Sequence, residues 1–589
     1  MNIGAALANR LLLVAFRGPA RRFHRGSRNL AAVQDALLRR YLEQNRDSRA
    51  GQRWGFGAIR SVEDYRARVP LSRWEDYQGD IQALREGETA VLTQEDVTLL
   101  EPTSGSSGGS KLIPYTRSLQ REYMAGVKPW LADLYQHYPR LLDGPAYWSV
   151  SPTMALLQGA FFGGAAPDQS PSQVPLGFQD DAQYFGPLAG LLRGIFPVPG
   201  AVKGLADLAD FRLATLVFLV MARDLRLISV WNPSFFTILL DFAQDEARAL
   251  VDSLASGRIL WLGPGPQGRP GADPFRFRPQ PERARELAKL LEMGDWPTRL
   301  WPHLGLISCW TQGQSRGAAR ELAARFPGVP IQGKGLLATE GIVSIPLVGA
   351  GVGLASGGLE DPTGSAAVLA YRSHFFEFLD RGGRFFGAAE LEPGMEVEPI
   401  LTTGGGLYRY QLGDRVRVRG WFRGLPVLDF LGRTGVSDIC GEKLAGDFVA
   451  RVLDRVLARV LGGGQNQGAS PLAPTHERLG FSLLAPVQDR GVGRPAYCLF
   501  VGGVGPAPRA EKLEQWRRQV EGALRENIHY DYARSLGQLN DLQIQWLAGD
   551  PARRWQEFRV SRGMSPGQIK TEALYRGRDI RDCFSRKEN

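Results

Sequence analysis

A run rich in glycine and hydroxyl residues, ending in a lysine, is the part of the chain best suited to chemistry. Between Thr103 and Lys111 the sequence places three glycines, five hydroxyl side chains and one lysine. Glycine can adopt the left-handed backbone angles that turn successive N–H groups toward a bound anion. The run is not a Walker A loop, because Ser110 stands where the second glycine belongs and Leu112 follows the lysine. We therefore predict a phosphate-binding loop of another type.

The alternative for this run is a flexible Ser/Gly linker at the surface. The apolar residues 97–100 come shortly before it, and Leu112, Ile113 and Pro114 follow it at once. Flexible linkers are seldom held so closely between apolar segments. The flanking sequence therefore favours the phosphate loop over the linker.

A second candidate lies between Leu401 and Arg433, where glycines lead into a segment of Tyr and Arg residues. Gly413 and Asp414 stand there directly ahead of an alternating Val/Arg strand. A Gly-Asp pair by itself indicates only a hairpin turn. A functional role for Asp414 therefore depends on its context in the chain.

Length and composition limit the classes of protein to consider. At 589 residues the chain exceeds what one hydrophobic core supports, so at least two domains are expected. An apolar share of 43% and a charged share of 22% exclude bulk disorder. The net charge of +10 suits anionic substrates, but Lys and Arg are spread along the whole chain, as on a solvated surface. No cluster of basic and aromatic residues indicates a nucleic-acid partner.

Neither cysteine nor histidine spacing indicates a metal site or a disulfide framework. The four cysteines form no CxxC pair, and the six histidines form no HExxH or HxH pattern. Each histidine is therefore interpreted as a surface or packed residue rather than a metal ligand.

Residues 3–16 are apolar enough to be compared with a signal peptide. A signal peptide has its cations before the apolar run, but here Arg10 interrupts the run and Arg17, Arg21 and Arg22 come after it. No small-residue cleavage site follows the run. We expect an amphipathic helix that covers the core. No window reaches about 18 uncharged apolar residues, so we predict a soluble, cytoplasmic protein without a membrane partner.

Helical and strand-like segments alternate through the first two thirds of the chain, as expected for layered α/β architecture. Helical periodicity is clear over residues 29–44, 282–291, 448–461 and 508–527. Strand-like runs occupy residues 97–100, 227–230, 304–309, 366–371, 416–418 and 497–501. Loops rich in Pro and Gly are expected at residues 163–177, 263–273 and 462–474.

Four segments in a fixed order give the chain a family resemblance. They are the loop at Thr103–Lys111, GLLATEG at Gly335–Gly341, SHFFEFL at Ser373–Leu379 and LYRYQLGD at Leu407–Asp414. Residues 56–95 and 527–570 extend the likeness toward both ends. Together they resemble the auxin-responsive acyl acid amido synthetase family, a branch of the adenylate-forming superfamily.

The resemblance implies a fold and a division into domains. The fold is an α/β adenylate-forming fold, with a large layered α/β N-terminal domain and a small α+β C-terminal domain. The large domain, over residues 1–430, would bind ATP and the acyl acid. The small domain, over residues 431–589, would be mobile.

The resemblance also implies ATP and Mg²⁺ as cofactors and assigns residues to them. Ser106, Ser107 and the backbone at Gly108 would hold the ATP phosphates, with Lys111 near the loop. Thr339 would touch the α-phosphate region, and Glu340 would bind Mg²⁺. The stretch from Gly335 to Ala338 would line the adenine pocket, and Asp414 would accept hydrogen bonds from the ribose hydroxyls.

The C-terminal assignments concern a hinge and a late lysine. Arg433 stands where the superfamily's hinge begins. Lys570 matches a lysine that the small domain brings to the active site, where it would take part in catalysis with Thr339 and Glu340. Lys443 matches a further family lysine only weakly. Gln411 replaces an arginine common in the family, and the Thr-Glu-Gly form resembles the bacterial branch, so auxin is not assumed to be the substrate.

Aromatic segments between the nucleotide motifs are candidates for the acyl-acid pocket. Trp148, Trp231, Phe235 and Trp310 would give it apolar or aryl-binding walls. Each of these side chains is equally compatible with an ordinary place in the core.

The function implied is an ATP-dependent ligase. A carboxylic acid would be adenylated, and an amine, such as an amino acid, would then displace AMP to give an amide. Such a protein fits secondary metabolism, with small-molecule acid and amine substrates and a monomer favoured. The alternative within the same fold is a thiol acceptor, coenzyme A or a carrier protein. A catalytically inactive acid sensor is disfavoured because Thr339, Glu340, Asp414 and Lys570 are all present.

Overall fold

The computed structural model describes most of the chain, with gaps. The described residues are 2–103, 111–148, 174–177, 189–205, 207–266, 275–312, 315–352, 365–433, 436–437, 442, 444–461, 479–487, 495–503, 506–535, 539–562, 564–566, 569, 572–577 and 579–584. They divide into two compact units: unit 1 comprises residues 1–430 and 562–568, and unit 2 comprises residues 431–561 and 569–589. Each unit is described by itself.

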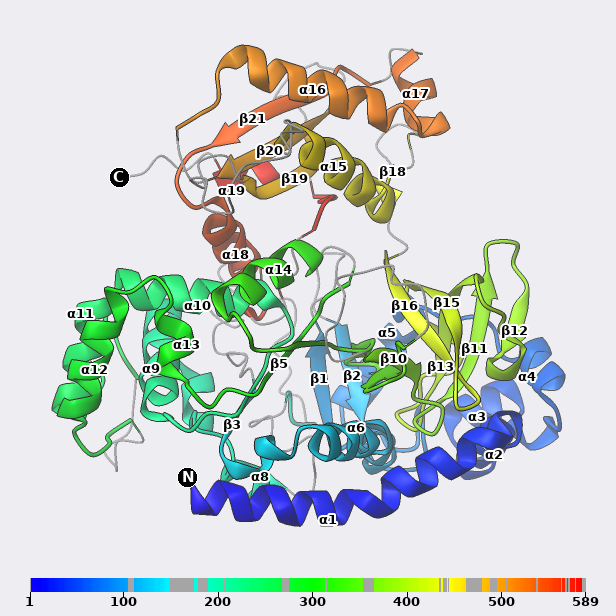
Figure 1. Cartoon of the computed structure of the whole chain (residues 1–589). Helices are drawn as coiled ribbons and strands as arrows, with labels where there is room; N and C mark the ends of the chain where they lie inside the picture. Colours follow the sequence, from blue (N-terminus) through cyan, green and yellow to red (C-terminus); the bar gives the residue numbers. More distant parts are fainter. Residues whose placement is uncertain are drawn as a thin grey trace. The chain divides into compact units, whose positions relative to one another are not determined.

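A parallel sheet forms one half of unit 1 (Figure 1). Its strands are β3 (Ala146–Trp148), β4 (Leu227–Ser229), β5 (Leu306–Cys309) and β6 (Ile331–Gly333), in the order β3-β4-β5-β6. These strands are short apolar runs because both faces of a parallel sheet are covered. A separate buried cluster joins the sheet to helices that include α9 (Leu208–Met221), α10 (Pro233–Asp245) and α14 (Arg316–Arg325). The expected α/β layering is confirmed.

Helices α11 (Ala247–Ser256), α12 (Pro281–Leu291) and α13 (Trp296–Leu300) complete this half of unit 1. Helices α11 and α12 pack on one another beside α9 (Figure 1). The chain between β4 and β5 is therefore used to build a helical layer beside the sheet rather than to enter the sheet itself.

An antiparallel sheet forms the other half of unit 1. Its strand order is β12-β11-β13-β15-β16-β10-β9, with β14 also paired to β13. The strands are β9 (Ser344–Leu347), β10 (Ala366–Leu369), β11 (Phe375–Asp380), β12 (Phe385–Gly387), β13 (Glu396–Thr402), β14 (Tyr410–Gln411), β15 (Asp414–Phe422) and β16 (Leu425–Arg433). In β15 buried Val416 and Val418 alternate with more exposed arginines, the pattern of a sheet with one face on the core.

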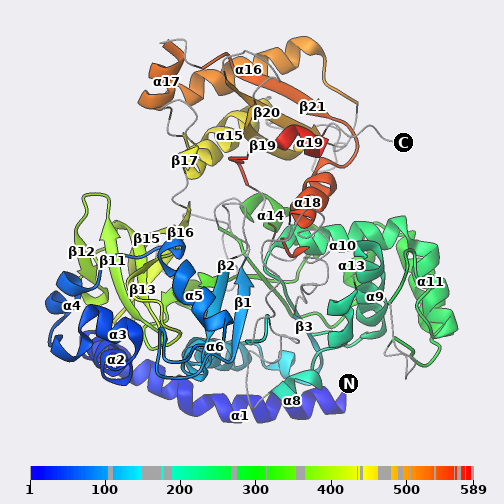
Figure 2. The ribbon, with the colours of Figure 1, turned by 180° about the vertical axis from the view of Figure 1, so that it is seen from behind.

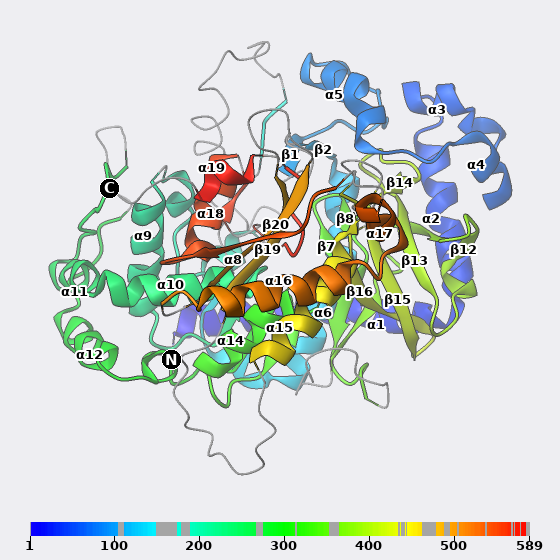
Figure 3. The same cartoon turned by 90° about the horizontal axis from the view of Figure 1, so that it is seen from above.

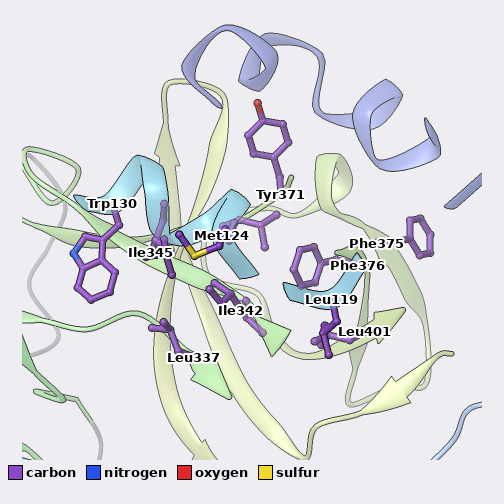
Figure 4. Packing of buried hydrophobic residues seen from close by; sticks show 14 of the residues in the cluster. Leu119, Met124, Trp130, Leu337, Ile342, Ile345, Tyr371, Phe375, Phe376 and Leu401 are labelled. Carbon is purple, nitrogen blue, oxygen red and sulfur yellow. The ribbon is translucent and has the colours of Figure 1, made fainter. Parts of the chain in front are cut away.

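Helix α6 (Arg117–His137) connects the two halves of unit 1. Thr116 caps its first turn by accepting a hydrogen bond from the Leu119 N–H. Figure 4 shows Met124 and Trp130 of α6 in the same buried cluster as Ile342 and Ile345. Helix α6 therefore sets the position of the strands that follow β6.

The N-terminal helices enclose one side of unit 1 (Figures 1 and 2). They are α1 (Ile3–Gly26), α2 (Leu30–Gln44), α3 (Arg49–Trp54), α4 (Val62–Arg68) and α5 (Gln78–Arg85), and α8 (Ala189–Arg193) lies against α1. Helix α1 buries Leu12, Phe16 and Phe23, so the predicted amphipathic helix is confirmed. Within the described residues, no helix combines the length and the apolar character needed to cross a membrane.

Two small hairpins complete unit 1. Strands β1 (Leu99–Thr103) and β2 (Lys111–Tyr115) pair antiparallel, with Thr103 opposite Lys111. Strands β7 (Leu337–Ala338) and β8 (Gly341–Ile342) pair antiparallel around Thr339 and Glu340.

Unit 2 is built on a mixed sheet of β19 (Leu479–Val487), β20 (Ala496–Gly503) and β21 (Gln543–Leu547). Helices α15 (Gly446–Leu461) and α16 (Ala510–Leu524) share a core with this sheet (Figure 3). Its remaining elements are β17 (Val436–Ser437), β18 (Leu444–Ala445), α17 (Ile528–Ser535), α18 (Pro551–Ser561) and α19 (Ile580–Phe584).

The predicted helices and strands are confirmed, with shifted ends. The strand expected at residues 416–418 extends over Asp414–Phe422, and the strand expected at residues 97–100 begins at Leu99 and continues to Thr103. The pairing of β1 with β2 explains the extension, because the ladder reaches the start of the Ser/Gly run. Most of the Pro/Gly loop at residues 163–177, part of 263–273, and residues 462–474 lie outside the described residues.

Candidate active site

The carboxyl edge of the parallel sheet gathers polar and aromatic side chains. Strand β3 ends at Trp148, and Trp231 and Trp310 follow β4 and β5. Because parallel strands all end at the same edge, these residues come together although they are far apart in sequence. The Trp310 N–H donates to the Trp231 carbonyl at 2.9 Å, which fixes the two segments to one another. Ligands of open α/β sheets bind at this kind of edge.

A buried lysine, Lys334, lies among the rings of Trp148, Trp231 and Trp130, the last of which belongs to α6. The Lys334 Nζ is 4.9 Å from the ring centroid of Trp130, 5.6 Å from that of Trp148 and 5.1 Å from that of Trp231. It donates a hydrogen bond to the Ser229 Oγ at 2.7 Å. Burial lowers the pKa of Lys334 to about 7, while the nearby Cys309 acts in the opposite direction. The ammonium charge is therefore easily gained and lost near neutral pH.

Three of the four predicted pocket residues belong to this group, and one does not. Trp231 and Trp310 are 5.7 Å apart between ring centroids, and Trp148 lies 5.9 Å from Trp130. Phe235, by contrast, lies on α10 within the buried cluster beside the sheet, with only 3% of its surface exposed. The structure thus brings the tryptophans together and packs Phe235 in the core.

The hairpin of β7 and β8 presents Thr339 and Glu340 at its turn. The Tyr115 hydroxyl donates to the Thr339 carbonyl at 2.9 Å, and the Tyr123 hydroxyl donates to the Ala338 carbonyl at 2.9 Å. Tyr115 ends β2, so the strand that leaves the Ser/Gly run is attached directly to this turn. The two tyrosines fix the backbone on which Thr339 and Glu340 are carried.

Two glycines of the GLLATEG segment are required by close packing. A Cβ on Gly335 would lie 2.0 Å from the Ser344 carbonyl oxygen, and one on Gly341 would lie 2.6 Å from the His374 Nε2. Backbone cannot move aside as a flexible side chain can, so a substitution at Gly335 would displace the hairpin. The segment's glycines thus position its functional residues.

A buried histidine and a glutamate hold the hairpin from behind. The His374 Nε2 accepts a hydrogen bond from the Ile342 N–H at 3.0 Å, and its Nδ1 lies 3.1 Å from the Glu122 carboxylate. Because Nε2 accepts, the ring proton belongs on Nδ1 and is donated to Glu122. Glu122 also accepts from the Gly404 N–H at 2.8 Å and pairs with Arg40 at 3.2 Å. This network ties the hairpin to the turn after β13.

A second buried ion pair joins the other two recognised segments. The Arg409 guanidinium donates to the Glu377 carboxylate at 2.9 Å, and Arg66 donates to the same carboxylate at 2.8 Å. Arg409 has a positive φ of 47°, a backbone conformation that non-glycine residues rarely adopt. The segments SHFFEFL and LYRYQLGD therefore contribute internal anchors as well as the predicted Asp414.

Glu340 is a buried carboxylate that fits a divalent cation. Its residue is 6% exposed, and within the described part of the chain no Lys or Arg pairs with it. Burial, and after it the charge of Glu340, raise the pKa of Tyr123. No group of three or more metal-ligating side chains occurs among the described residues. Such a site suits Mg²⁺ held by one carboxylate together with substrate phosphates.

Asp414 opens strand β15 on its inward face. Its residue is only 1% exposed and follows Gly413, whose φ of 73° makes the turn. The Gly413 N–H donates to the Glu398 carboxylate at 3.1 Å. Burial raises the pKa of Glu398, with a smaller contribution from the Asp414 charge. Two acidic side chains thus meet at the start of this strand.

Several predicted residues have no described environment. Ser106, Ser107, Gly108, Lys443 and Lys570 lie outside the described residues, and Arg433 ends β16 without a described side chain. Lys111 is half-buried at the start of β2. Gly335 follows Lys334 in the chain, and Ala338 ends β7 directly before Thr339.

Sequence reasoning missed Lys334, Trp130, His374 and Glu122 as members of the site. Lys334 had a usable signal, because it is one of nine lysines in the chain and directly precedes the GLLATEG segment. Trp130 and Glu122 had none, since both lie on the amphipathic helix α6 and look like ordinary helical residues.

Family models match most of the chain. The GH3 family N-terminal domain matches residues 19–159 and 177–331, the GH3 family central domain matches residues 367–433, and the GH3 family C-terminal domain matches residues 469–579. The matched parts include strands β3 to β5, which precede the GLLATEG segment, the segments SHFFEFL and LYRYQLGD, and most of unit 2.

Individual relatives are plant enzymes. An indole-3-acetic acid-amido synthetase, GH3.15 of Arabidopsis thaliana, is 23% identical over 576 residues, covering 92% of this chain and 90% of the relative. A probable indole-3-acetic acid-amido synthetase, GH3.6 of Oryza sativa subsp. japonica, is 30% identical over 244 residues, covering 38% of this chain and 48% of the relative. A jasmonoyl–L-amino acid synthetase, JAR6 of Nicotiana attenuata, is 22% identical, covering 70% of each chain.

A solved structure shows the same fold. The AtGH3.15 acyl acid amido synthetase in complex with 2,4-DB superposes with a TM-score of 0.77 at 19% identity, covering 95% of this chain and 93% of that structure. The adenylate-forming fold expected from the sequence is confirmed.

Proposed function

The chain belongs to the GH3 family, and from that premise we propose that it is an ATP-dependent ligase that joins a carboxylic acid to an amine. The acid is first adenylated, and the amine then displaces AMP to form an amide. Amino acids are the leading class of amine, because the jasmonoyl relative is named for joining its acid to an amino acid. Attachment to AMP is needed because a free carboxylate has no leaving group that an amine can displace.

One observation carries the proposal. The turn that bears Thr339 and Glu340 is fixed by Tyr115 and by the His374–Glu122 pair, and it follows directly from the carboxyl edge of the parallel sheet. The turn is thus bonded to the strand that leaves the Ser/Gly run, and residues 334–338 join it to the sheet edge at which the tryptophans lie. This order suits a nucleotide on one side and an acyl acid on the other.

The nucleotide roles follow from the residue types. Ser106, Ser107 and the backbone at Gly108 bind the ATP phosphates, with Lys111 near the loop, and Thr339 contacts the α-phosphate. Glu340 would hold Mg²⁺, which would supply positive charge to offset that of the ATP phosphates. The Asp414 carboxylate accepts hydrogen bonds from the ribose hydroxyls, since one carboxylate can accept from two donors. Gly335 to Ala338 line the adenine pocket.

The small domain is proposed to supply the remaining groups. Residues 1–430 form the large domain, and residues 431–589 form a mobile small domain that turns near Arg433. That motion brings Lys570 to the developing charge on the α-phosphate, and its withdrawal opens the acyl carbon to the amine. A hinge that serves two half-reactions in one site is an ordinary type of domain movement.

Trp148, Trp231 and Trp310 form the walls of the acyl-acid pocket. Flat, partly exposed aromatic rings bind apolar or aryl bodies with a large gain in buried area. The competing proposal within the same fold is a thiol acceptor, coenzyme A or a carrier protein. The match of the GH3 C-terminal domain over residues 469–579 favours the amine.

The test is product identification with alternative acceptors. The protein is incubated with Mg-ATP, a panel of aryl and alkyl acids, and amino acids, simple amines or coenzyme A in separate reactions. We expect an amide only when an amine is present. Thioester with coenzyme A and no amide with any amine would replace the proposal by its competitor.

A further inference from the structure

Lys334 is a buried cation for which the described residues provide no counter-charge. It is 7% exposed, and its side chain donates a hydrogen bond to the neutral Ser229 hydroxyl at 2.7 Å. No carboxylate of the described chain lies within ion-pair distance of it. Buried charges in proteins are normally paired, because removing a single charge from water is costly. We therefore expect the counter-charge of Lys334 to come from a negative group on a bound ligand.

The surroundings of Lys334 are suited to an aromatic ligand. The faces of Trp130, Trp148 and Trp231 lie about the ammonium group at 4.9 to 5.6 Å. Trp130 is almost fully buried and is fixed by its hydrogen bond to the Gln332 side chain at 3.1 Å, whereas Trp148 and Trp231 are only partly buried. Partly exposed rings beside a cation favour a ligand with a flat apolar body and a negative group.

Lys334 lies at the edge of the sheet where the acyl acid is proposed to bind. It directly follows β6 at the carboxyl edge of the sheet and precedes the turn of Thr339 and Glu340 by five residues. Its N–H donates to the Cys309 carbonyl at 2.8 Å, so the backbone of this segment is fixed to the neighbouring strand. The ammonium group therefore has a defined position rather than a free surface location.

The chemistry of adenylation decides which part of the acid Lys334 should bind. The reacting carboxylate loses its charge when it becomes bonded to AMP. A cation paired with that carboxylate would stabilise the free acid more than the transition state, which slows the step. A second negative group on the acid keeps its charge through both half-reactions, so a cation paired with it stabilises the free acid and the transition state alike.

We propose that Lys334 binds a second carboxylate on an aromatic acyl acid whose ring lies against Trp148 and Trp231. The inference rests on the proposed function and adds to it a class of substrate. An aromatic diacid supplies the missing counter-charge to Lys334 and an apolar body to the tryptophans. Its other carboxylate remains free to react near Thr339.

The first experiment compares pairs of aromatic acids that differ only in the second carboxylate. Acid-dependent pyrophosphate release should give a kcat/KM for the diacid about tenfold to hundredfold above that for the monoacid, the range of a charge-assisted hydrogen bond. Lys334→Met should remove this preference, so that the kcat/KM values of diacid and monoacid become equal within the variant. Lys128→Met, at a half-buried lysine of α6 outside the group, is the matched control and should keep the preference. Equal kcat/KM values for the pair in the unsubstituted protein would overturn the inference.

The second experiment needs neither turnover nor a folded variant. Lysines labelled at Cε are observed by NMR as the pH is varied, which is practical because the chain has nine lysines. A bound diacid should move the Lys334 titration to higher pH, since a negative partner favours the ammonium form. The monoacid should not. If no acid releases pyrophosphate and the diacid still moves this titration, the proposed function fails alone; if pyrophosphate is released and the titration does not move, this inference fails alone.

Discussion

Replacing Lys334 by methionine gives a prediction whose sign and size follow from burial. In the folded chain burial lowers the Lys334 pKa from 10.5 to about 7, so the unfolded chain holds this proton more tightly. Below about pH 7 both states are protonated, and the full cost of burying the ammonium is present. Between about pH 7 and 10.5 the folded chain has lost the proton and the unfolded chain has not, so stability rises with pH.

The magnitude comes from the size of the pKa change. At about 1.4 kcal/mol for each pKa unit, the cost of burial is about 5 kcal/mol at low pH and about 2 kcal/mol at pH 9. The three ring faces offset part of this cost, by roughly 0.5–1 kcal/mol each. From about pH 6 to about pH 9 we therefore expect the free energy of unfolding of the original protein to rise by about 1–3 kcal/mol relative to Lys334→Met.

The assay is urea unfolding of both proteins, followed by tryptophan fluorescence at the two pH values. Taking the difference between the proteins cancels other titrating groups and the packing contribution of the methionine. Lys128→Met serves again as the control, with a smaller change expected for a half-buried lysine. A difference that does not change with pH, or one that falls, would refute the assignment of Lys334 as a buried and destabilised cation.

Four further substitutions test the rest of the account. Glu340→Gln should reduce Mg²⁺-dependent adenylation by about 100-fold while circular dichroism stays unchanged; full activity would remove Glu340 from the metal site. Asp414→Ala should raise the KM for ATP by about tenfold or more, and an unchanged KM would exclude the ribose role. Lys570→Ala should slow single-turnover adenylate formation by about 100-fold with little effect on ATP binding, and an unaltered rate would reject its catalytic role. His374→Ala should lower the free energy of unfolding by about 1–3 kcal/mol, because Glu122 and the Ile342 N–H would each lose a buried hydrogen bond, while Glu122 keeps Arg40 and the Gly404 N–H; a loss below about 0.5 kcal/mol would mean that the pair does not anchor the hairpin.

The fold could be predicted from the sequence because its signals are local. Residues 282–291 and 448–461 show helical periodicity, and Leu306–Cys309 is an apolar run of the kind that parallel strands form. The family resemblance extends these local signals into an arrangement of domains. The strand before the Ser/Gly run ends three residues later than the sequence predicts, because its pairing with β2 extends it to Thr103.

The candidate site could be predicted only in part, because contacts between distant segments have no local signal. Trp148, Trp231 and Trp310 share a site since three parallel strands end at one edge, which sequence order alone does not show. Phe235 has the same residue type as a pocket wall, yet α10 directs it into the core. Glu122 meets His374 across 252 positions of the chain, a pairing that depends on where α6 crosses the sheet.

The central claim is that the acid is activated as an adenylate before the amine reacts. The protein is mixed with Mg-ATP and acid without any amine, the reaction is quenched, and acyl-AMP and pyrophosphate are quantified by mass spectrometry. The account predicts acyl-AMP in an amount equal to the pyrophosphate released, followed by its complete conversion to amide and AMP when amine is added. An acid-dependent reaction that yields ADP and an acyl phosphate, or an amide formed without any acyl-AMP, would contradict it.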